Sequence, residues 1–204
     1  MKIAVLGAGN IGGTLGKKWA GAGHHVFFGV RDPAGSRVQA TLREISGIAI
    51  AVSIEEALAE GEAVLLAIPG RVAEDVLRAN AAGLDGKIIM DAVNKIGDPQ
   101  MNCLAILAEA APRAIAYRAF NHLGWENFAD PTFSGVQADL LYCGPERSER
   151  AQVERLIRDI GLRPIYCGGP EQASLLDNLT SLWLYLARNL GKGRHLAFKL
   201  LTDE

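Results

Sequence analysis

The feature that most constrains the fold is the glycine pattern Gly-Ala-Gly-Asn-Ile-Gly at residues 7–12, which directly follows a short apolar run at residues 2–6. Residues 11–20 then have the apolar spacing of a helix. A strand, a glycine-rich turn and a helix in this order are the sequence context of a dinucleotide-binding unit. We therefore expect residues 1–168 to form a dinucleotide-binding domain.

Each position of the pattern has a separate physical role in that unit. Gly7 permits the tight turn, Gly9 lets the backbone approach a pyrophosphate, and Gly12 lets the helix pack against the sheet. Asn10 and Ile11 begin the helix, whose free N–H groups would face the phosphates. The alternative is a glycine-rich turn that binds no nucleotide.

The end of the second expected strand, residues 26–30, indicates which nicotinamide cofactor is bound. In NAD-binding units an acidic residue about 20 residues past the glycine pattern binds the adenosine ribose. Here Gly29 and Val30 stand at that place, and Arg31 comes next. Because a guanidinium is a planar, permanently charged donor that suits a 2′-phosphate, we expect NADP(H).

Two nearby residues have more than one interpretation. Arg37, at the start of the next expected helix, is either a second phosphate partner or a solvated helix residue. Asp32 could accept a hydrogen bond from a ribose hydroxyl, but Asp32-Pro33 more naturally opens a turn.

The chain continues as an alternation of apolar runs and helical segments, which predicts a doubly wound, mostly parallel α/β (Rossmann) sheet. Ser53 is expected to cap a helix that has acids in its first turn. The expected strands are residues 48–52, 63–68, 87–91, 114–119, 138–143 and 163–167. The other expected helices are residues 71–79, 104–110 and 149–160.

Residues 169–204 form a different unit, predicted to be helical from 171 to 201 with a break at 191–193. Residues 182–187 are apolar around the whole helix, whereas a surface helix carries one apolar stripe. A second subunit would cover the remaining side, so we expect a homodimer, with this segment also contributing to the acceptor pocket. The alternative is a helix buried in its own domain. A membrane span is excluded by length and by three polar residues, Asp177, Asn178 and Arg188.

Composition excludes several classes of function. The 204 residues are 49% hydrophobic with a net charge of −2, and no basic face favours nucleic acid. The first strand begins directly after Met1 and leaves no room for a signal peptide, so a cytoplasmic protein is expected.

Three cysteines without pairing motifs predict free thiols: Cys103, Cys143 and Cys167. Four histidines without ligand spacing predict no metal site: His24, His25, His122 and His195.

Several motifs at the expected strand ends together resemble the NADPH-dependent deazaflavin oxidoreductases, which use coenzyme F420. They are GAGNIGG at 7–13, AGHHVFFGVRD at 22–32, AIP at 67–69, DAVN at 91–94, AFNHLG at 119–124, YCG at 142–144 and GLRP at 161–164. The resemblance implies hydride transfer between NADP(H) and a deazaflavin ring. The cytosolic domain of membrane ferric reductases, which passes electrons to flavin, is also similar.

The resemblance also implies roles for single residues. Arg31 resembles the arginine that holds the 2′-phosphate. Residues implied to line the ribose and nicotinamide are Ala67, Ile68, Pro69, Asn94 and Asn121. His122 and Leu123 are implied to lie towards the substrate. His122 stands where threonine is commoner, and Lys95-Ile96 replaces Asn-Pro, so the sequence departs from the family on the acceptor side. The alternative for Asn121 and His122 is that they only satisfy turn backbone.

Hydride transfer between a nicotinamide and a flat ring needs two stacked rings in a dry site and no catalytic side chain. Three aromatic residues after the AFN motif either wall the acceptor pocket or belong to the core: Trp125, Phe128 and Phe133. One alternative function is reduction of a small imine or carbonyl, which needs a general acid. After Cys167 the only lysines are Lys192 and Lys199, so the C-terminal segment offers few residues from which to build a general acid. A third possible function is that of a sensor, which binds NADP without turning it over.

Overall fold

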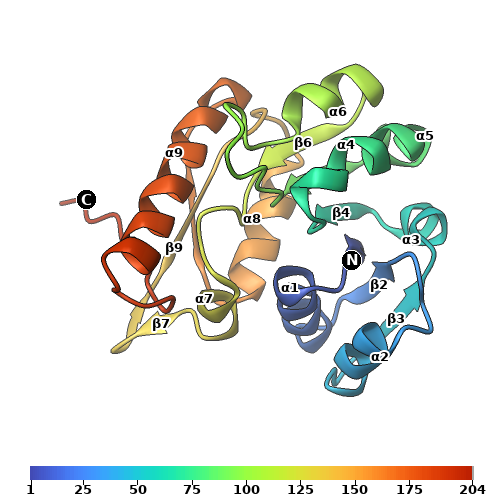
Figure 1. Cartoon of the computed structure of the whole chain (residues 1–204), viewed down its shortest axis with the longest axis horizontal. Helices are drawn as coiled ribbons and strands as arrows, with labels where there is room; N and C mark the ends of the chain where they lie inside the picture. Colours follow the sequence, from blue (N-terminus) through green and yellow to red (C-terminus); the bar gives the residue numbers. More distant parts are fainter. Residues whose placement is uncertain (204) are drawn as a thin grey trace.

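A six-stranded parallel sheet forms the centre of the protein in this computed structural model, which describes residues 1–203. The strand order is β3-β2-β1-β4-β5-β6 (Figure 1). The strands are β1 (Lys2–Leu6), β2 (His25–Gly29), β3 (Ala49–Val52), β4 (Ala63–Leu66), β5 (Ile88–Asp91) and β6 (Ile115–Arg118). The expected doubly wound fold is confirmed. Because the order reverses between β1 and β4, the carboxyl edge there is the place where open α/β sheets bind ligands.

Helices cover both faces of this sheet, because successive strand residues point to opposite sides. Ile3 and Val5 of β1 belong to one core cluster, whereas Ala4 and Leu6 belong to the other. The first cluster packs on α1 (Asn10–Gly21), α2 (Ser36–Arg43), α7 (Trp125–Ala129) and α8 (Arg150–Asp159). The second packs on α3 (Ile54–Glu60), α4 (Gly70–Ala79), α5 (Ala81–Leu84) and α6 (Leu104–Ala110).

Ser53 caps α3 as expected. Its hydroxyl accepts from the Glu56 amide at 3.2 Å, and the Glu56 carboxylate accepts from the Ser53 amide at 2.9 Å. This reciprocal pair is a capping box, which satisfies two backbone donors at the helix start.

The late strands form a separate small sheet. β9 (Asp139–Tyr142) pairs in parallel with β10 (Arg163–Tyr166), and an antiparallel bridge joins Arg118 of the main sheet to Cys143. A short hairpin of β7 (Thr132–Phe133) and β8 (Val136–Gln137) precedes them, and this hairpin, α5 and α7 were not predicted.

The C-terminal segment is helical only in its first part. A 3₁₀ turn, η1 (Pro170–Gln172), leads into α9 (Ala173–Leu184) and a π-helical turn, η2 (Tyr185–Asn189). The prediction of helix up to residue 201 is wrong, because residues 190–203 are not helical.

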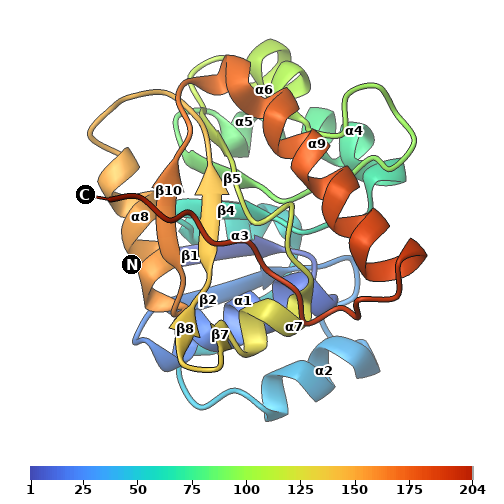
Figure 2. The same ribbon diagram turned by 90° about the vertical axis from the view of Figure 1, so that its left-hand side faces the viewer.

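Tertiary hydrogen bonds explain why the helix does not resume. Gly191 and Gly193 have φ of 63° and 83°, which turns the chain out of the helix. The Trp183 indole donates to the Leu196 carbonyl at 2.6 Å, and the Asp139 amide donates to the Phe198 carbonyl at 3.2 Å. The backbone of this segment is therefore engaged by the domain, and Figure 2 shows it crossing β10 and β9.

All three cysteines are free thiols; Cys103 and Cys143 are buried and Cys167 is half-buried. Among the helices of residues 1–203, none combines the length and apolar character needed to cross a bilayer. The same residues contain no group of three or more His, Cys, Asp or Glu side chains arranged to hold a metal ion.

Candidate functional site: the carboxyl edge of the sheet

The predicted cofactor residues lie in a row along the carboxyl edge of the sheet. Each follows a strand end, and the register of the parallel strands sets their order. From β2 to β6 the row is Val30 and Arg31, then Gly7 to Gly12, then Ala67 to Pro69, then Asn94, then Asn121. Parallel strands bring these five segments to one edge although they are far apart in sequence.

The glycine turn between β1 and α1 has the geometry its sequence predicts. Gly7 has φ of 100°, a conformation that favours glycine. A Cβ at Gly12 would lie 2.0 Å from the Gly7 carbonyl oxygen, and a Cβ at Gly7 would lie 2.6 Å from the Ala67 carbonyl oxygen. A side chain at Gly12 would therefore push α1 away from the turn, and one at Gly7 would push the turn away from the segment that follows β4.

The start of α1 fits an anionic group. No side chain caps this helix, its first turn holds no acid, and Gly9 is its N-cap. A Cβ at Gly9 would meet only the Arg37 guanidinium, at the ordinary contact distance of 3.9 Å, so the flexible end of this side chain borders the space beside the turn. Arg37 donates to the Asn10 side-chain oxygen at 3.2 Å. A phosphate in this space would meet free helix N–H groups and a guanidinium.

The segment after β2, the strand that pairs with β1, carries a second cation. Arg31 is exposed, and within residues 1–203 it forms no ion pair. The Asp32 carboxylate accepts from the Ala34 amide at 3.2 Å, and the Asp32 carbonyl accepts from the Gly35 amide at 3.1 Å. Asp32 therefore forms the turn expected of Asp-Pro, and Arg31 is the free charged group at the strand end. Together with the helix start, these residues fit a dinucleotide that carries an additional phosphate.

The predicted residues after β6 are not accessible from this edge, because all three are buried: Asn121, His122 and Leu123. The Asn121 side-chain amide donates to the Leu176 carbonyl at 3.0 Å and to the Thr180 hydroxyl at 2.8 Å, while its oxygen has no partner in the described part of the chain. His122 is fully buried, and neither ring nitrogen has a hydrogen-bond partner among residues 1–203. Burial, and then the charge of Arg118, lowers the pKa of His122 to about 3. His122 is thus a neutral core residue in this structure.

Sequence reasoning missed a buried charge network behind Asn94 and Asn121. Arg118 of β6 is fully buried and lies 2.7 Å from Asp177 of α9 and 3.6 Å from Asp91 of β5. Burial raises the pKa of Asp91, although Arg118 opposes the shift. The signal was available, because opposite charges in an apolar strand and an apolar helix are rare unless they are paired.

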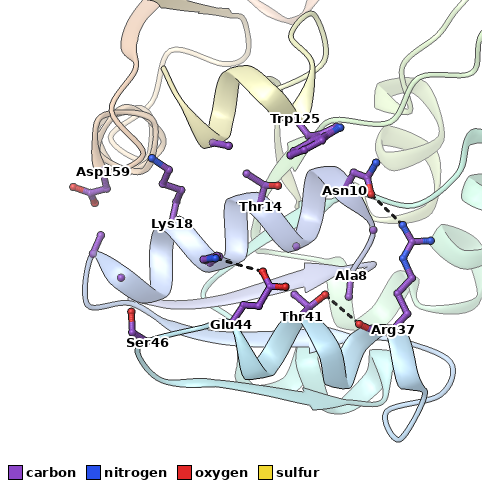
Figure 3. Close-up of a pocket in the computed structure, with 16 residues that line it drawn as sticks. Ala8, Asn10, Thr14, Lys18, Arg37, Thr41, Glu44, Ser46, Trp125 and Asp159 are labelled. Atoms are coloured by element: carbon purple, nitrogen blue, oxygen red, sulfur yellow. Dashed lines mark hydrogen bonds and ion pairs between the residues drawn. The ribbon is translucent and has the colours of Figure 1, made fainter. Parts of the chain in front are cut away.

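A cleft of about 690 Å³ begins at the phosphate end of the edge and runs along α1 (Figure 3). It shares Gly9, Asn10 and Arg37 with the predicted cofactor residues, whereas the other predicted residues lie outside it. Its remaining walls come from α1, α2, α7, the segment before β3 and the end of α8, including Thr14, Lys17, Lys18, Thr41, Glu44, Ser46, Trp125 and Asp159.

The three aromatic residues that follow β6 lie in different environments. Trp125 is exposed and lines the cleft. Phe128 is fully buried in the core, so it does not wall a pocket. Phe133 stacks on His195, with ring centroids 4.2 Å apart.

Comparison with known proteins identifies the family. Residues 2–95 match the family model described as NADP oxidoreductase, coenzyme F420-dependent. The chain is 30% identical to an F420-dependent NADP reductase of Methanothermobacter marburgensis over 91% of this chain and 92% of that protein. The chain belongs to this family. It is accordingly an NADP-dependent oxidoreductase.

Two further proteins, one of known structure and one compared by sequence, are similar to this member of the reductase family. A solved structure described as a candidate F420-dependent NADP reductase of Arthrobacter superimposes with a TM-score of 0.86, at 26% identity, over 99% of this chain and 100% of the other. A glycerol-3-phosphate dehydrogenase [NAD(P)+] of Azotobacter vinelandii is 25% identical over 98% of this chain, which spans 62% of that protein's length.

Proposed function

We propose that this protein transfers a hydride between NADPH and a flat ring acceptor of the deazaflavin or flavin type. The observation that carries the proposal is a pair of exposed guanidiniums on neighbouring segments: Arg37 contacts Asn10 at the uncapped start of α1, and Arg31 follows β2, the strand that pairs with β1. A 2′-phosphate needs such charged, forked donors, and a plain adenosine ribose does not. The names of the relatives support coenzyme F420 as the acceptor.

The chemistry of the edge favours a ring acceptor. Bound NADPH supplies the hydride from its nicotinamide ring. The ionisable side chains that end β5 and β6, Asp91, Arg118 and His122, are all buried and take no part in proton exchange with a substrate. Such an edge binds and orients two rings, which is what hydride transfer between them requires.

Lys95 is the residue whose replacement distinguishes hydride transfer to a ring from the alternative function, reduction of a small imine or carbonyl. It follows Asn94 directly, and its Cα lies 2.9 Å from where a Cβ at Gly70 would be. Reduction of an imine or carbonyl needs a general acid. Lys95 is a half-buried cation next to Asn94, so it is the candidate for that acid.

The test mixes the purified protein with NADPH and, separately, with F420, FMN, FAD and a small imine, and follows NADPH absorbance. The proposal predicts turnover with at least one ring acceptor, and the variant Lys95→Met retains that turnover. Turnover with the imine alone, lost in Lys95→Met, would instead identify a metabolite reductase. Tight NADPH binding without any turnover would identify a sensor.

We also propose that the protein is a homodimer through the outer face of α9. Leu176, Thr180 and Trp183 of this helix are buried, whereas Leu175 and Leu182 on the opposite side are exposed. Tyr185 and Leu190 continue the exposed apolar face. Light scattering should give twice the mass of one chain, and Leu182→Glu should give a monomer. A monomeric parent protein would refute this assignment.

A further inference from the structure

Arg118 uses every donor that its side chain has. Its Nε and one Nη2 hydrogen go to Asp177 Oδ1, at 3.0 and 2.7 Å. Its Nη1 group donates to the carbonyl oxygens of Asp91 and Val93. The second Nη2 hydrogen goes to the side-chain oxygen of Asn94, at 2.6 Å. A guanidinium has five donor hydrogens, so none remains for a ligand.

Asp177 holds the other side of the pair and belongs to α9. Its Oδ2 accepts from the Asn102 side chain at 2.8 Å, so both carboxylate oxygens have partners. Asp177 is 5% exposed and Arg118 is fully buried. The two residues therefore tie α9 to the ends of β5 and β6, and neither can touch a bound cofactor.

Asn94 is the point where this network reaches the cofactor edge. Its side-chain oxygen faces Arg118, and its nitrogen donates to the Asn121 carbonyl at 2.8 Å. The opposite amide orientation would set two donors against each other at Arg118 and two acceptors against each other at Asn121. Asn94 is only half-buried, and one hydrogen of its NH₂ group has no partner among residues 1–203.

We propose that Arg118 and Asp177 are a positioning pair that orients the Asn94 carboxamide as a hydrogen-bond donor to the nicotinamide half of the bound cofactor. The proposal rests on the proposed function, because it assumes a nicotinamide cofactor at this edge. The ligand atom is an acceptor, such as a ribose hydroxyl or carboxamide oxygen.

The first test changes Asn94 itself. Asn94→Asp keeps an acceptor for Arg118 but loses the NH₂ donor, and Asn94→Leu loses both. The proposal predicts that the Kd for NADPH, measured by calorimetry, rises about tenfold in both variants. Asn94→Leu should unfold at a lower temperature, since it leaves an Arg118 donor unpaired, and Asn94→Asp should also lose stability, because its second carboxylate oxygen faces the Asn121 carbonyl.

Asn80→Asp is the matched control, because Asn80 lies at the far end of α4 and donates to the Val76 carbonyl. Its Kd for NADPH should equal that of the parent protein. A parent-like Kd in Asn94→Asp would overturn the proposal.

The second test changes the positioning pair. Arg118→Lys keeps the charge opposite Asp177, but an ammonium has three donors and cannot reach all the acceptors that Arg118 serves. We expect kcat per folded active site to fall about tenfold or more, with a raised KM for NADPH, because misplacing a reacting group is costly. A purely structural role would lower only the folded fraction, measured by titrating NADPH-binding sites, and would leave kcat per site and KM unchanged. That second result would refute the positioning role. If instead the parent protein bound no NADPH, the proposed function itself would be wrong.

Discussion

Gly12 of α1 lies directly against Gly7 of the preceding turn: a Cβ at position 12 would be 2.0 Å from the Gly7 carbonyl oxygen. This contact holds the uncapped start of α1 at the end of β1. It also explains why the glycine pattern carries so much information, because the backbone must come this close for the helix N–H groups to reach a pyrophosphate.

Gly12→Ala should therefore destabilise the protein by about 1–3 kcal/mol, as expected for overpacking, and should abolish NADPH binding. Gly21→Ala is the control on the same helix, since a Cβ there meets nothing within 4 Å. Urea unfolding and calorimetry measure the two effects. A Gly12→Ala protein that binds NADPH normally would show that α1 does not carry the phosphate.

Arg31→Asp should weaken NADPH binding by about 10- to 100-fold, because it removes charge-assisted hydrogen bonds to the 2′-phosphate. NADH binding should change little. Arg43→Asp makes the same charge change at an exposed position near the end of α2 and should affect neither cofactor. Equal losses for NADPH and NADH in Arg31→Asp would contradict the phosphate role.

The elements that sequence predicted well are those specified by local chemistry. The glycines at 7, 9 and 12 dictated a turn whose geometry the structure confirms, and the expected helix at 104–110 agrees with α6. Parallel strands buried on both faces have near-continuous apolar runs, as β4 shows with four buried residues.

The parts that sequence could not predict depend on long-range contacts. Residues 190–203 have helical composition, yet the side chains of Asn127 and Asp139 accept hydrogen bonds from the Leu196 and Leu200 amides and hold this backbone in a non-helical course. Arg118 and Asp177 are 59 residues apart; their apolar surroundings in sequence indicate that each has a partner, but not which residue the partner is. His122 was assigned to the substrate side by resemblance, but the fold encloses it.

His122 should make stability depend on pH. Its pKa is about 3 in the folded protein and about 6.5 in an unfolded chain, so the unfolded state binds more protons between these values. The free energy of unfolding therefore falls as pH decreases, by about 2 kcal/mol between pH 7 and pH 5 from this residue. Urea unfolding of the parent and of His122→Phe measures it. If both proteins lose the same stability over this interval, His122 is not the buried neutral group described above.

Trp125 is the aromatic residue that lines the cleft, and we propose that the ring acceptor stacks on it there. Trp125→Ala should raise the KM for a ring acceptor about tenfold through lost stacking, while the Kd for NADPH stays constant. Trp125→Phe keeps an aromatic face and should recover most of the affinity. An unchanged KM in Trp125→Ala would place the acceptor elsewhere.

The most direct test of the central claim uses NADPH carrying deuterium at the transferred position, mixed with oxidised coenzyme F420 without oxygen. The account predicts that NADPH disappears and the deazaflavin ring is reduced at equal rates, with the deuterium recovered on the ring and NADH reacting far more slowly. Unreacted NADPH with F420 and with the flavins alike, reduced F420 without deuterium on its ring, or equal rates with NADH would contradict it.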